Sequence, residues 1–356
     1  MIQKILSYDT PRSIALSMLL LCIFAGLALA PFLFPGVRTV DTAARICIFI
    51  VLVASYDLLL GYGGIVSFAH TMFFGVGAYS VALTSLHLGR GFDALILGAA
   101  IGAVLATCLA AAIGLFSLRV RAIFFAMITL AVASALAVLV SQFSDLTGGE
   151  DGLTFKLPRE LGPAFKFGQT LFDGTVFGVK LNGKLLTYYL VFGTSLVLFL
   201  ITLRLVNAPF GRVLQAIREN EFRAEAIGYR VVHYKIAATC LSAAIASCAG
   251  ALYAIWLRYV GPSTTLSLEL MIDILLILVI GGMGTIYGAV IGATLFLLTE
   301  NYLQAAMGRL TSGIGDIPVV SALLSPDRWL LWMGILFIVS VYCFPKGIVG
   351  HFRKDP

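Results

Sequence analysis

The sequence alternates long apolar stretches with short polar segments. The apolar stretches are roughly 20 residues long, which is the length that an α-helix needs to cross a hydrocarbon core about 30 Å thick. Ten such stretches predict about ten transmembrane helices, at residues 13–34, 42–60, 71–88, 93–116, 122–142, 185–206, 236–257, 269–281, 285–306 and 329–344. The stretches 269–281 and 329–344 are short for a straight crossing, which favours half-helices or helices longer than the pattern shows.

The composition fits this pattern. Hydrophobic residues make up 60% of the chain and charged residues 12%, with a mean hydropathy of +1.00. We therefore expect an all-α integral membrane protein with a single transmembrane domain over residues 1–356. The first apolar stretch is longer than a signal peptide core and lacks a small-residue cleavage site, so we interpret it as a retained first span.

The net charge of +6 indicates membrane orientation rather than nucleic-acid binding, because the basic residues lie between apolar stretches and form no patch. Four basic clusters fall on one side of the predicted helices, which places both termini in the cytoplasm: Lys4 and Arg12; Arg119 and Arg121; the segment 207–235; and Lys346, Arg353 and Lys354. The segment 143–184 is then an external loop. Tryptophans at the outer helix ends, Trp256, Trp329 and Trp332, are typical of interfacial anchors.

Motifs for chemistry are weak. The six cysteines lie in or beside apolar stretches without a CxxC pair, so neither disulfides nor a zinc site is indicated. Residues 178–184, GVKLNGK, match part of a phosphate-binding loop, but Leu185 stands where a Ser or Thr is needed. No catalytic set, metal motif or cofactor site is expected.

Charged residues within or beside the apolar stretches are the candidates for ion or proton coupling. Arg45, Asp57 and Glu300 lie near segment ends and are expected to reach the interface, which leaves Asp273 as the deeper one. One such residue gives little support for a proton relay.

Two glycine-rich stretches, 58–80 and 279–296, interrupt the apolar pattern. A helix broken inside a membrane needs new partners for its backbone groups, and such breaks occur beside translocation paths. The residues predicted to line a substrate path are Tyr62, Gly63, Gly64, Ser67, His70, Gly281, Gly282 and Gly284. The alternative is that the glycines serve helix packing, which we favour for the pairs Gly98 and Gly102, and Gly288 and Gly292. A lone histidine such as His70 is more often structural.

The segment 207–235 is a polar cytoplasmic segment with amphipathic character. Val213, Leu214 and Ile217 predict a short helix with an apolar stripe, Asn220 ends it or caps the next helix, and Gly228 stops a second helix. A plain connector needs no such helices. The segment is therefore predicted to dock a partner.

Several stretches together resemble the LivM-type permeases of branched-chain amino-acid ABC importers. They are YDLLLGYGGIVSFAHTMFFGVGAYS at 56–80, LTGGEDGL at 146–153, GRVLQAIRENEFRAEAIGY at 211–229, LSAAIASCAGALYA at 241–254 and IGGMGTIYGAVIGA at 280–293. The resemblance covers most of the chain in order.

The resemblance implies a multi-pass subunit of the bacterial inner membrane that performs no chemistry itself. Its implied partners are a homologous second permease subunit, two cytoplasmic ATPases and a periplasmic substrate-binding protein, within the lipid bilayer. The residues implied in ATPase coupling are Arg212, Arg218, Glu219, Glu221, Ala224 and Gly228. Those implied to face the binding protein are Thr147, Gly148, Gly149 and Glu150. The coupling segment departs from the broader EAAxxxG importer pattern, because Phe222 and Arg223 occupy its first two positions.

Other function classes stay open. An ion- or proton-coupled secondary carrier is the main alternative, followed by a channel and a membrane enzyme. The docking segment discriminates, because a carrier needs none. Branched-chain or other amino acids, urea or small amides, and aromatic acids are all compatible substrates.

Overall fold

The computed structural model describes residues 14–33, 36–117, 122–162, 175–176, 179–180, 182–313, 325, 328–344 and 347–352. The basic residues Lys4, Arg12, Arg119, Arg121, Lys346, Arg353 and Lys354, and the side chain of Trp329, lie outside the described part.

Every predicted apolar stretch contains a helix. The ten helices are α2 (Ile14–Leu33), α3 (Val37–Asp57), α4 (His70–His87), α5 (Phe92–Ser117), α6 (Ala122–Gln142), α8 (Gly183–Asn207), α11 (Val231–Leu257), α13 (Leu268–Gly281), α14 (Ile286–Gly313) and α16 (Trp329–Cys343). Helix α11 starts at Val231 rather than at 236, because polar residues such as Lys235 continue a helix past the apolar run. The predicted cytoplasmic segment is shortened accordingly. Helix α13 is short, as expected.

Short elements connect these helices. They are the π-helix η1 (Leu58–Tyr62), α7 (Ser144–Thr147), the 3₁₀ turns η2 (Gly149–Asp151) and η3 (Arg159–Leu161), α9 (Pro209–Glu219), α10 (Glu221–Ala226), α12 (Pro262–Thr265) and α17 (Gly347–Phe352). Two small antiparallel sheets pair β1 (Leu153–Thr154) with β4 (Tyr259–Val260), and β2 (Thr175–Val176) with β3 (Val179–Lys180).

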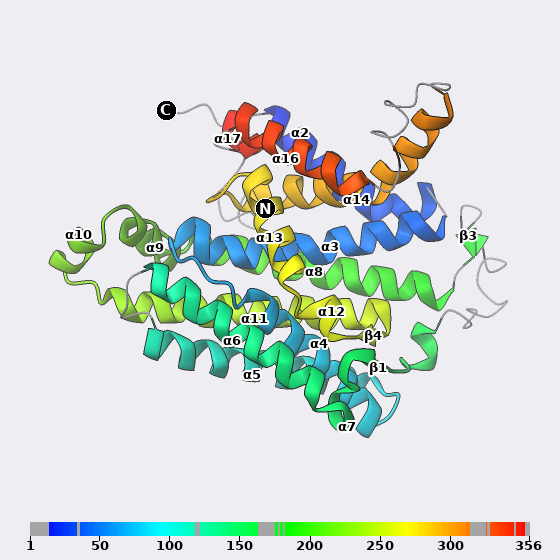
Figure 1. Cartoon of the computed structure of the whole chain (residues 1–356), viewed down its shortest axis with the longest axis horizontal. Helices are drawn as coiled ribbons and strands as arrows, with labels where there is room; N and C mark the ends of the chain where they lie inside the picture. Colours follow the sequence, from blue (N-terminus) through cyan, green and yellow to red (C-terminus); the bar gives the residue numbers. More distant parts are fainter. Residues whose placement is uncertain are drawn as a thin grey trace.

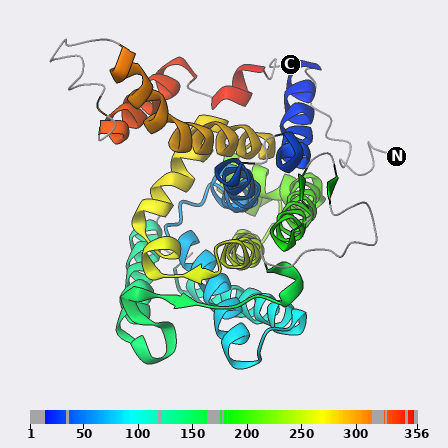
Figure 2. The same cartoon turned by 90° about the vertical axis from the view of Figure 1, so that its right-hand side faces the viewer.

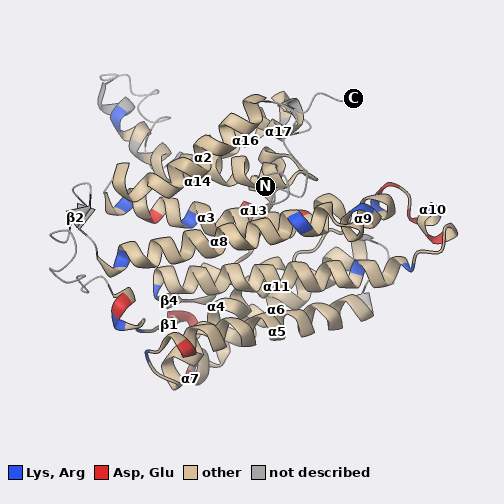
Figure 3. Cartoon of the chain, turned by 180° about the vertical axis from the view of Figure 1, so that it is seen from behind, with Lys and Arg blue, Asp and Glu red and all other residues tan. Residues whose placement is uncertain are grey.

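The helices form one bundle in which several long helices run side by side (Figure 1). Helices α9 and α10 lie at one end of the bundle, and α7 with the small strands lies at the other. Charged residues gather toward these two ends, whereas the ribbon between them is largely uncharged (Figure 3). Within the described residues, eight helical segments are long and apolar enough to cross a membrane. The chain is a multi-pass membrane protein.

Helix α3 occupies the centre of the bundle (Figure 2). Every residue from Ile46 to Leu59 is buried, and the helix contacts α2, α8, α11, α13 and α14. A helix that is apolar on all sides is stable only when other helices or lipid surround it. Since residues 46–59 are enclosed, protein contacts alone set the position of this part of the chain.

The peripheral helices α5, α6 and α16 instead expose apolar side chains outward. Ile96 and Val104 on α5, Ile123 and Val138 on α6, and Ile338 on α16 are more than half exposed. Such an apolar surface is stable against lipid but not against water. These helices therefore form the lipid-facing wall.

Glycines permit close contact between α4, α5 and α11. A Cβ on Gly77 would overlap the carbonyl group of Ser247, and a Cβ on Gly102 would lie 3.0 Å from the Gly77 Cα. Gly98 packs similarly, with Val81 Cα 2.8 Å from its Cβ position. Gly288 and Gly292 likewise allow close contact between α13 and α14. The packing interpretation of both glycine pairs is confirmed.

Trp256 corrects one expectation. It lies at the end of α11, as expected, but its side chain is 7% exposed. Its Nε1–H donates a 2.7 Å hydrogen bond to Asp41 Oδ1 of α3, and Lys184 Nζ lies 5.5 Å from its ring centroid. Trp256 is a packing and hydrogen-bonding residue, because α3 and α8 cover the end of α11.

Substitution of Gly77 by alanine tests the close crossing. The added Cβ must push α4 and α11 apart, and overpacking of this kind costs about 1–3 kcal/mol. The matched control is Gly193→Ala on α8, where nothing lies within 4 Å of the new Cβ. In thermal unfolding of the detergent-purified protein, Gly77→Ala should lower the midpoint and Gly193→Ala should not. Equal midpoints would contradict the crossing.

Candidate functional site

The two glycine-rich breaks meet at the α9 end of the bundle. The first break begins where α3 widens into the π-helix η1 and continues to the start of α4; its Gly64 has a φ of +66°. The second lies between α13 and α14, where Gly282 and Gly284 have φ values of +116° and +78°. A Cβ on Gly61 would overlap the backbone nitrogen of Gly284. The breaks therefore touch backbone to backbone.

Asp57 links the two breaks. Its Oδ1 accepts a 2.8 Å hydrogen bond from the Gly284 N–H. This amide precedes the first turn of α14. A carboxylate is stabilised there because a helix N-terminus has unpaired N–H groups and a partial positive charge.

The expectation that Asp57 reaches the interface is wrong. Its side chain is fully buried, because η1 extends the chain beyond it and Gly284 covers it. The sequence signal for this contact is a carboxylate immediately before the glycine-rich break in an otherwise apolar run.

Arg218, in the last turn of α9, completes the contact between the breaks. Its Nη1 donates a hydrogen bond to the Gly61 carbonyl oxygen of η1, and its charge interacts with that of Asp57. A Cβ on Gly64 would lie 3.1 Å from Arg218 Cγ, and a Cβ on Gly284 would lie 3.0 Å from its Nη1. The arginine thus fits against three glycines. We call Asp57, Gly61, Arg218 and Gly284 the joint.

Helix α9 is held to the bundle by its apolar stripe. Leu214 and Ile217 are 0% and 2% exposed, and Ile217 packs in a cluster with Ala224 and Val231. The predicted stripe therefore exists, but it faces the bundle rather than a partner. Burying this stripe aims Arg218, one residue after Ile217, at Gly61.

The ends of α10 follow the predicted pattern. The Asn220 side chain caps α10 by accepting a 2.9 Å hydrogen bond from the Arg223 N–H. Gly228 ends it with a φ of +100°, and the Tyr229 N–H bonds to the Ala224 carbonyl. A 2.8 Å ion pair joins Glu221 to Lys235 of α11.

Five of the predicted coupling residues are exposed, namely Arg212, Arg218, Glu219, Glu221 and Gly228. Arg218 is exposed and also donates to the Gly61 carbonyl in the joint. Ala224 is 4% exposed. Large apolar side chains that sequence reasoning did not single out lie exposed around α10: Phe222, Ile227 and Tyr229.

The predicted path residues also divide. Gly64, Gly282 and Gly284 hold left-handed backbone in the breaks. Tyr62, Gly63 and Ser67 are buried in the first break. Gly281 belongs to α13 and packs against the backbone of Gly288. Gly282 also supports α17, because a Cβ on Gly347 would overlap its Cα.

His70 lies in a buried polar cluster at the start of α4. Its Nε2 is 2.8 Å from Ser55 Oγ, which itself donates to the Leu52 carbonyl; we therefore assign the proton of this pair to His70 Nε2. Ser242 Oγ of α11 donates to the Ser55 carbonyl. The cluster fixes the start of α4 against α3 and α11, inside the bundle.

At the opposite end, the segment 147–150 is mostly structural. Thr147 Oγ1 donates to the carbonyls of Val140 and Phe143. Gly148 and Gly149 have φ values of +74° and +61°. Glu150 is exposed. Of these predicted contact residues, Glu150 has the side chain free to meet a partner at this end.

Residues 38–341 match the family described as "Branched-chain amino acid transport system / permease component". The chain belongs to this permease family.

Two similar curated proteins are high-affinity branched-chain amino acid transport system permease proteins LivM, from Escherichia coli and Salmonella typhimurium. The permease is 28% identical to each over 275 residues, which cover 75% of this chain and 64% of the relative. A probable LivM permease protein of Methanocaldococcus jannaschii is 24% identical over 303 residues, which cover 82% of this chain and 81% of that protein. No solved structure matches the permease.

Replacing Asp57 tests what holds the breaks together. Asp57→Ala leaves the Gly284 N–H buried without its acceptor, which costs about 1–3 kcal/mol. Asp57→Asn retains an acceptor oxygen and should lose less. Thermal unfolding of the purified permease measures both, with the exposed Glu219→Ala as the control, expected within about 0.5 kcal/mol of wild type. If Asp57→Ala is as stable as the control, the carboxylate does not fasten α14 to α3.

Proposed function

We propose that the permease is the transmembrane subunit of an ATP-binding-cassette importer that translocates branched-chain or related amino acids. Its family supports a transport role, and the printed names of its relatives support this substrate class. The match spans 64% of the length of the two bacterial relatives. Its proposed location is the bacterial inner membrane.

The proposed partners are a homologous second permease subunit, two cytoplasmic ATPases and a periplasmic binding protein. The exposed apolar side chains of Phe222, Ile227 and Tyr229 offer an ATPase a docking surface, since such a group is costly to leave in water. Glu150 lies at the opposite end, where a binding protein would deliver substrate.

The observation that carries the proposal is the hydrogen bond from Arg218 to the Gly61 carbonyl. It joins α9, a helix of the predicted cytoplasmic segment, to the first break. An ATPase that displaces α9 would therefore displace η1, and through Asp57 it would displace the start of α14. Rigid helices joined at flexible glycine turns can transmit such a displacement and shift the balance between two states.

The orientation that this function requires is testable by cysteine labelling. Asn220→Cys should react with a membrane-impermeant thiol reagent only after the cytoplasmic side is opened, whereas Glu150→Cys should react in intact cells. Both residues are exposed. A difference in their labelling therefore reports which side of the membrane each one faces. Labelling of Asn220→Cys from outside would reverse the orientation and remove the ATPase proposal.

Arg218→Gln tests transmission through the joint. Loss of a hydrogen bond from a charged donor is worth about 1.5–3 kcal/mol, so uptake is expected to fall about tenfold or more. Reconstituted complexes would be assayed for uptake and for ATPase stimulation by loaded binding protein, and both should fall. The ATPase should still copurify, because the Arg218 side chain contacts the bundle.

Arg212→Gln is the matched control on the same helix, because both arginines are exposed and the contact with the first break is the Arg218 hydrogen bond to Gly61. Any effect of Arg212→Gln should be on ATPase binding. The complexes that still form should couple ATP hydrolysis to uptake as the wild type does. Substrate accumulation driven by a proton or sodium gradient without an ATPase would instead favour the secondary carrier. Full coupling in Arg218→Gln would remove the joint from the mechanism.

A further inference from the structure

The chain between η1 and α4, residues 63–69, crosses part of the bundle without helical structure. It starts beside the joint and ends at His70, whose Nε2 lies 2.8 Å from Ser55 Oγ. Ser242, which donates to the Ser55 carbonyl, lies near the middle of α11. The segment therefore runs from the α9 end of the bundle to about the middle of its length. Non-helical backbone at this depth of a membrane needs partners other than lipid.

The segment 63–69 lies on an outer face of the subunit, where α13 and α6 flank it (Figure 1 and Figure 2). A hydrogen bond of 3.0 Å ties it to α6, donated by the Phe68 N–H to Thr129 Oγ1. Thr129 is buried, and its own hydroxyl donates to the Ala126 carbonyl. The first half of α6 is thus fixed against the segment.

A groove of about 290 Å³ lies between the segment and α6. Every side chain that lines it is apolar. The lining residues are Val66 and Phe68 of the segment, and Ile123, Ala126, Met127 and Leu130 of α6. Ile123 and Met127 are 75% and 63% exposed, so the groove opens to the outside of the subunit. We call these six residues the break groove.

Val66 brings unpaired backbone groups to the break groove. No described residue accepts a hydrogen bond from its N–H or donates one to its carbonyl. The nearby amides are satisfied, because Ile65 donates to the Leu59 carbonyl and Phe68 donates to Thr129. Val66 is also partly exposed. Whatever covers the break groove therefore lies beside a peptide unit that needs hydrogen-bond partners.

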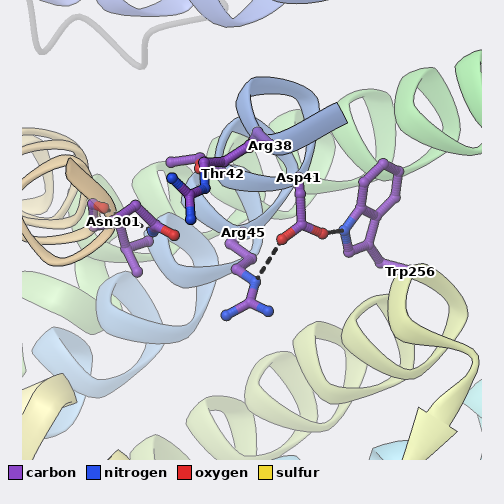
Figure 4. Close-up of polar contacts among 7 residues, drawn as sticks. Arg38, Asp41, Thr42, Arg45, Trp256 and Asn301 are labelled. Atoms are coloured by element: carbon purple, nitrogen blue, oxygen red, sulfur yellow. Dashed lines mark hydrogen bonds and ion pairs between the residues drawn. The ribbon is translucent and has the colours of Figure 1, made fainter. Parts of the chain in front are cut away.

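The outer end of α3 shows the opposite situation. Asp41 Oδ1 accepts a 2.7 Å hydrogen bond from Trp256 Nε1–H of α11, and Asp41 Oδ2 lies 3.2 Å from Arg45 Nε (Figure 4). Both oxygens of this carboxylate have partners within the subunit. Asp41 thus needs no partner from another protein, whereas Val66 does.

A groove on the membrane face of a protein is covered by lipid, by water or by another protein. Lipid tails form no hydrogen bonds, so they would leave the Val66 groups unsatisfied. The lining disfavours water, because apolar cavities stay dry. A helix of another protein meets both conditions, since it presents apolar side chains to the groove and a polar side chain to the backbone groups. Ala126, which is small, lets such a helix approach closely.

We propose that the break groove is the surface on which a membrane-spanning helix of the homologous second permease subunit packs. The inference rests on the proposed function, which supplies this partner, and it adds where the two subunits meet. The Ile123 end of α6 then belongs to the interface rather than to the lipid-facing wall. Because Val66 and Phe68 lie between the joint and α4, the second subunit contacts the first break directly.

Site-specific photocrosslinking in lipid nanodiscs tests this surface. The photoreactive amino acid p-benzoylphenylalanine is placed at Met127, or at Val104 on α5 as the control, because these side chains are 63% and 62% exposed. After irradiation of the assembled complex, the Met127 position should give an adduct with the second subunit, identified by mass spectrometry of its peptides. The Val104 position should give no such adduct, because that side chain faces lipid.

A tryptophan in the break groove gives a second measurement. Ala126→Trp fills space that the partner's helix needs, so less of the second subunit should copurify with the permease from solubilised membranes. Ala135→Trp is the control, at an exposed position of α6 outside the groove, and should leave this recovery unchanged. Equal amounts of the two variants in the membrane show that both insert.

Several results would overturn the proposed surface. A Met127 position that reacts with phospholipid or with a second copy of this chain, and not with the second subunit, would assign the break groove to that occupant. Equal adduct yields from Met127 and Val104, no adduct from either, or unchanged recovery with Ala126→Trp would place the interface elsewhere. ATP-dependent uptake by the wild-type complex is measured separately. Its absence would remove the importer proposal, and the adduct would still report where the two subunits meet.

Discussion

The structure depends on one constraint of the bilayer, which is that a broken helix must find new partners for its backbone groups within the protein. This chain has two broken helical regions, and the backbone groups of both breaks find partners at the same place. The carboxylate of Asp57 accepts from the amide that precedes α14, and Arg218 donates to the carbonyl of Gly61. These contacts therefore hold the two breaks together.

The second partner comes from outside the spanning helices. Arg218 belongs to α9, which its buried Leu214 and Ile217 attach to the bundle. The Gly61 carbonyl of η1 consequently keeps this donor only while α9 is in place. A connecting segment between α8 and α11 thus contacts the end of α3, and the proposed coupling follows from this contact.

Much of this arrangement is local and could be predicted from the sequence. Apolar length locates the ten helices, and consecutive glycines locate the breaks. Asn220 and Gly228 mark the ends of α10. The contacts between distant segments could not be predicted, because hydropathy does not show that Asp57 meets Gly284 or that the α9 stripe faces inward. The same limit applies to helix length, since α3 begins before residue 42 and α14 continues beyond residue 306.

The contact of Gly347 with Gly282 has a practical consequence. Helix α17 rests directly on the second break, and Val349 in the same helix is 2% exposed. The last described helix therefore packs on the second break. An affinity tag or fluorescent protein joined closely behind α17 would press on this contact, so a long flexible spacer, or labelling at the α7 end, is the sounder choice for functional work.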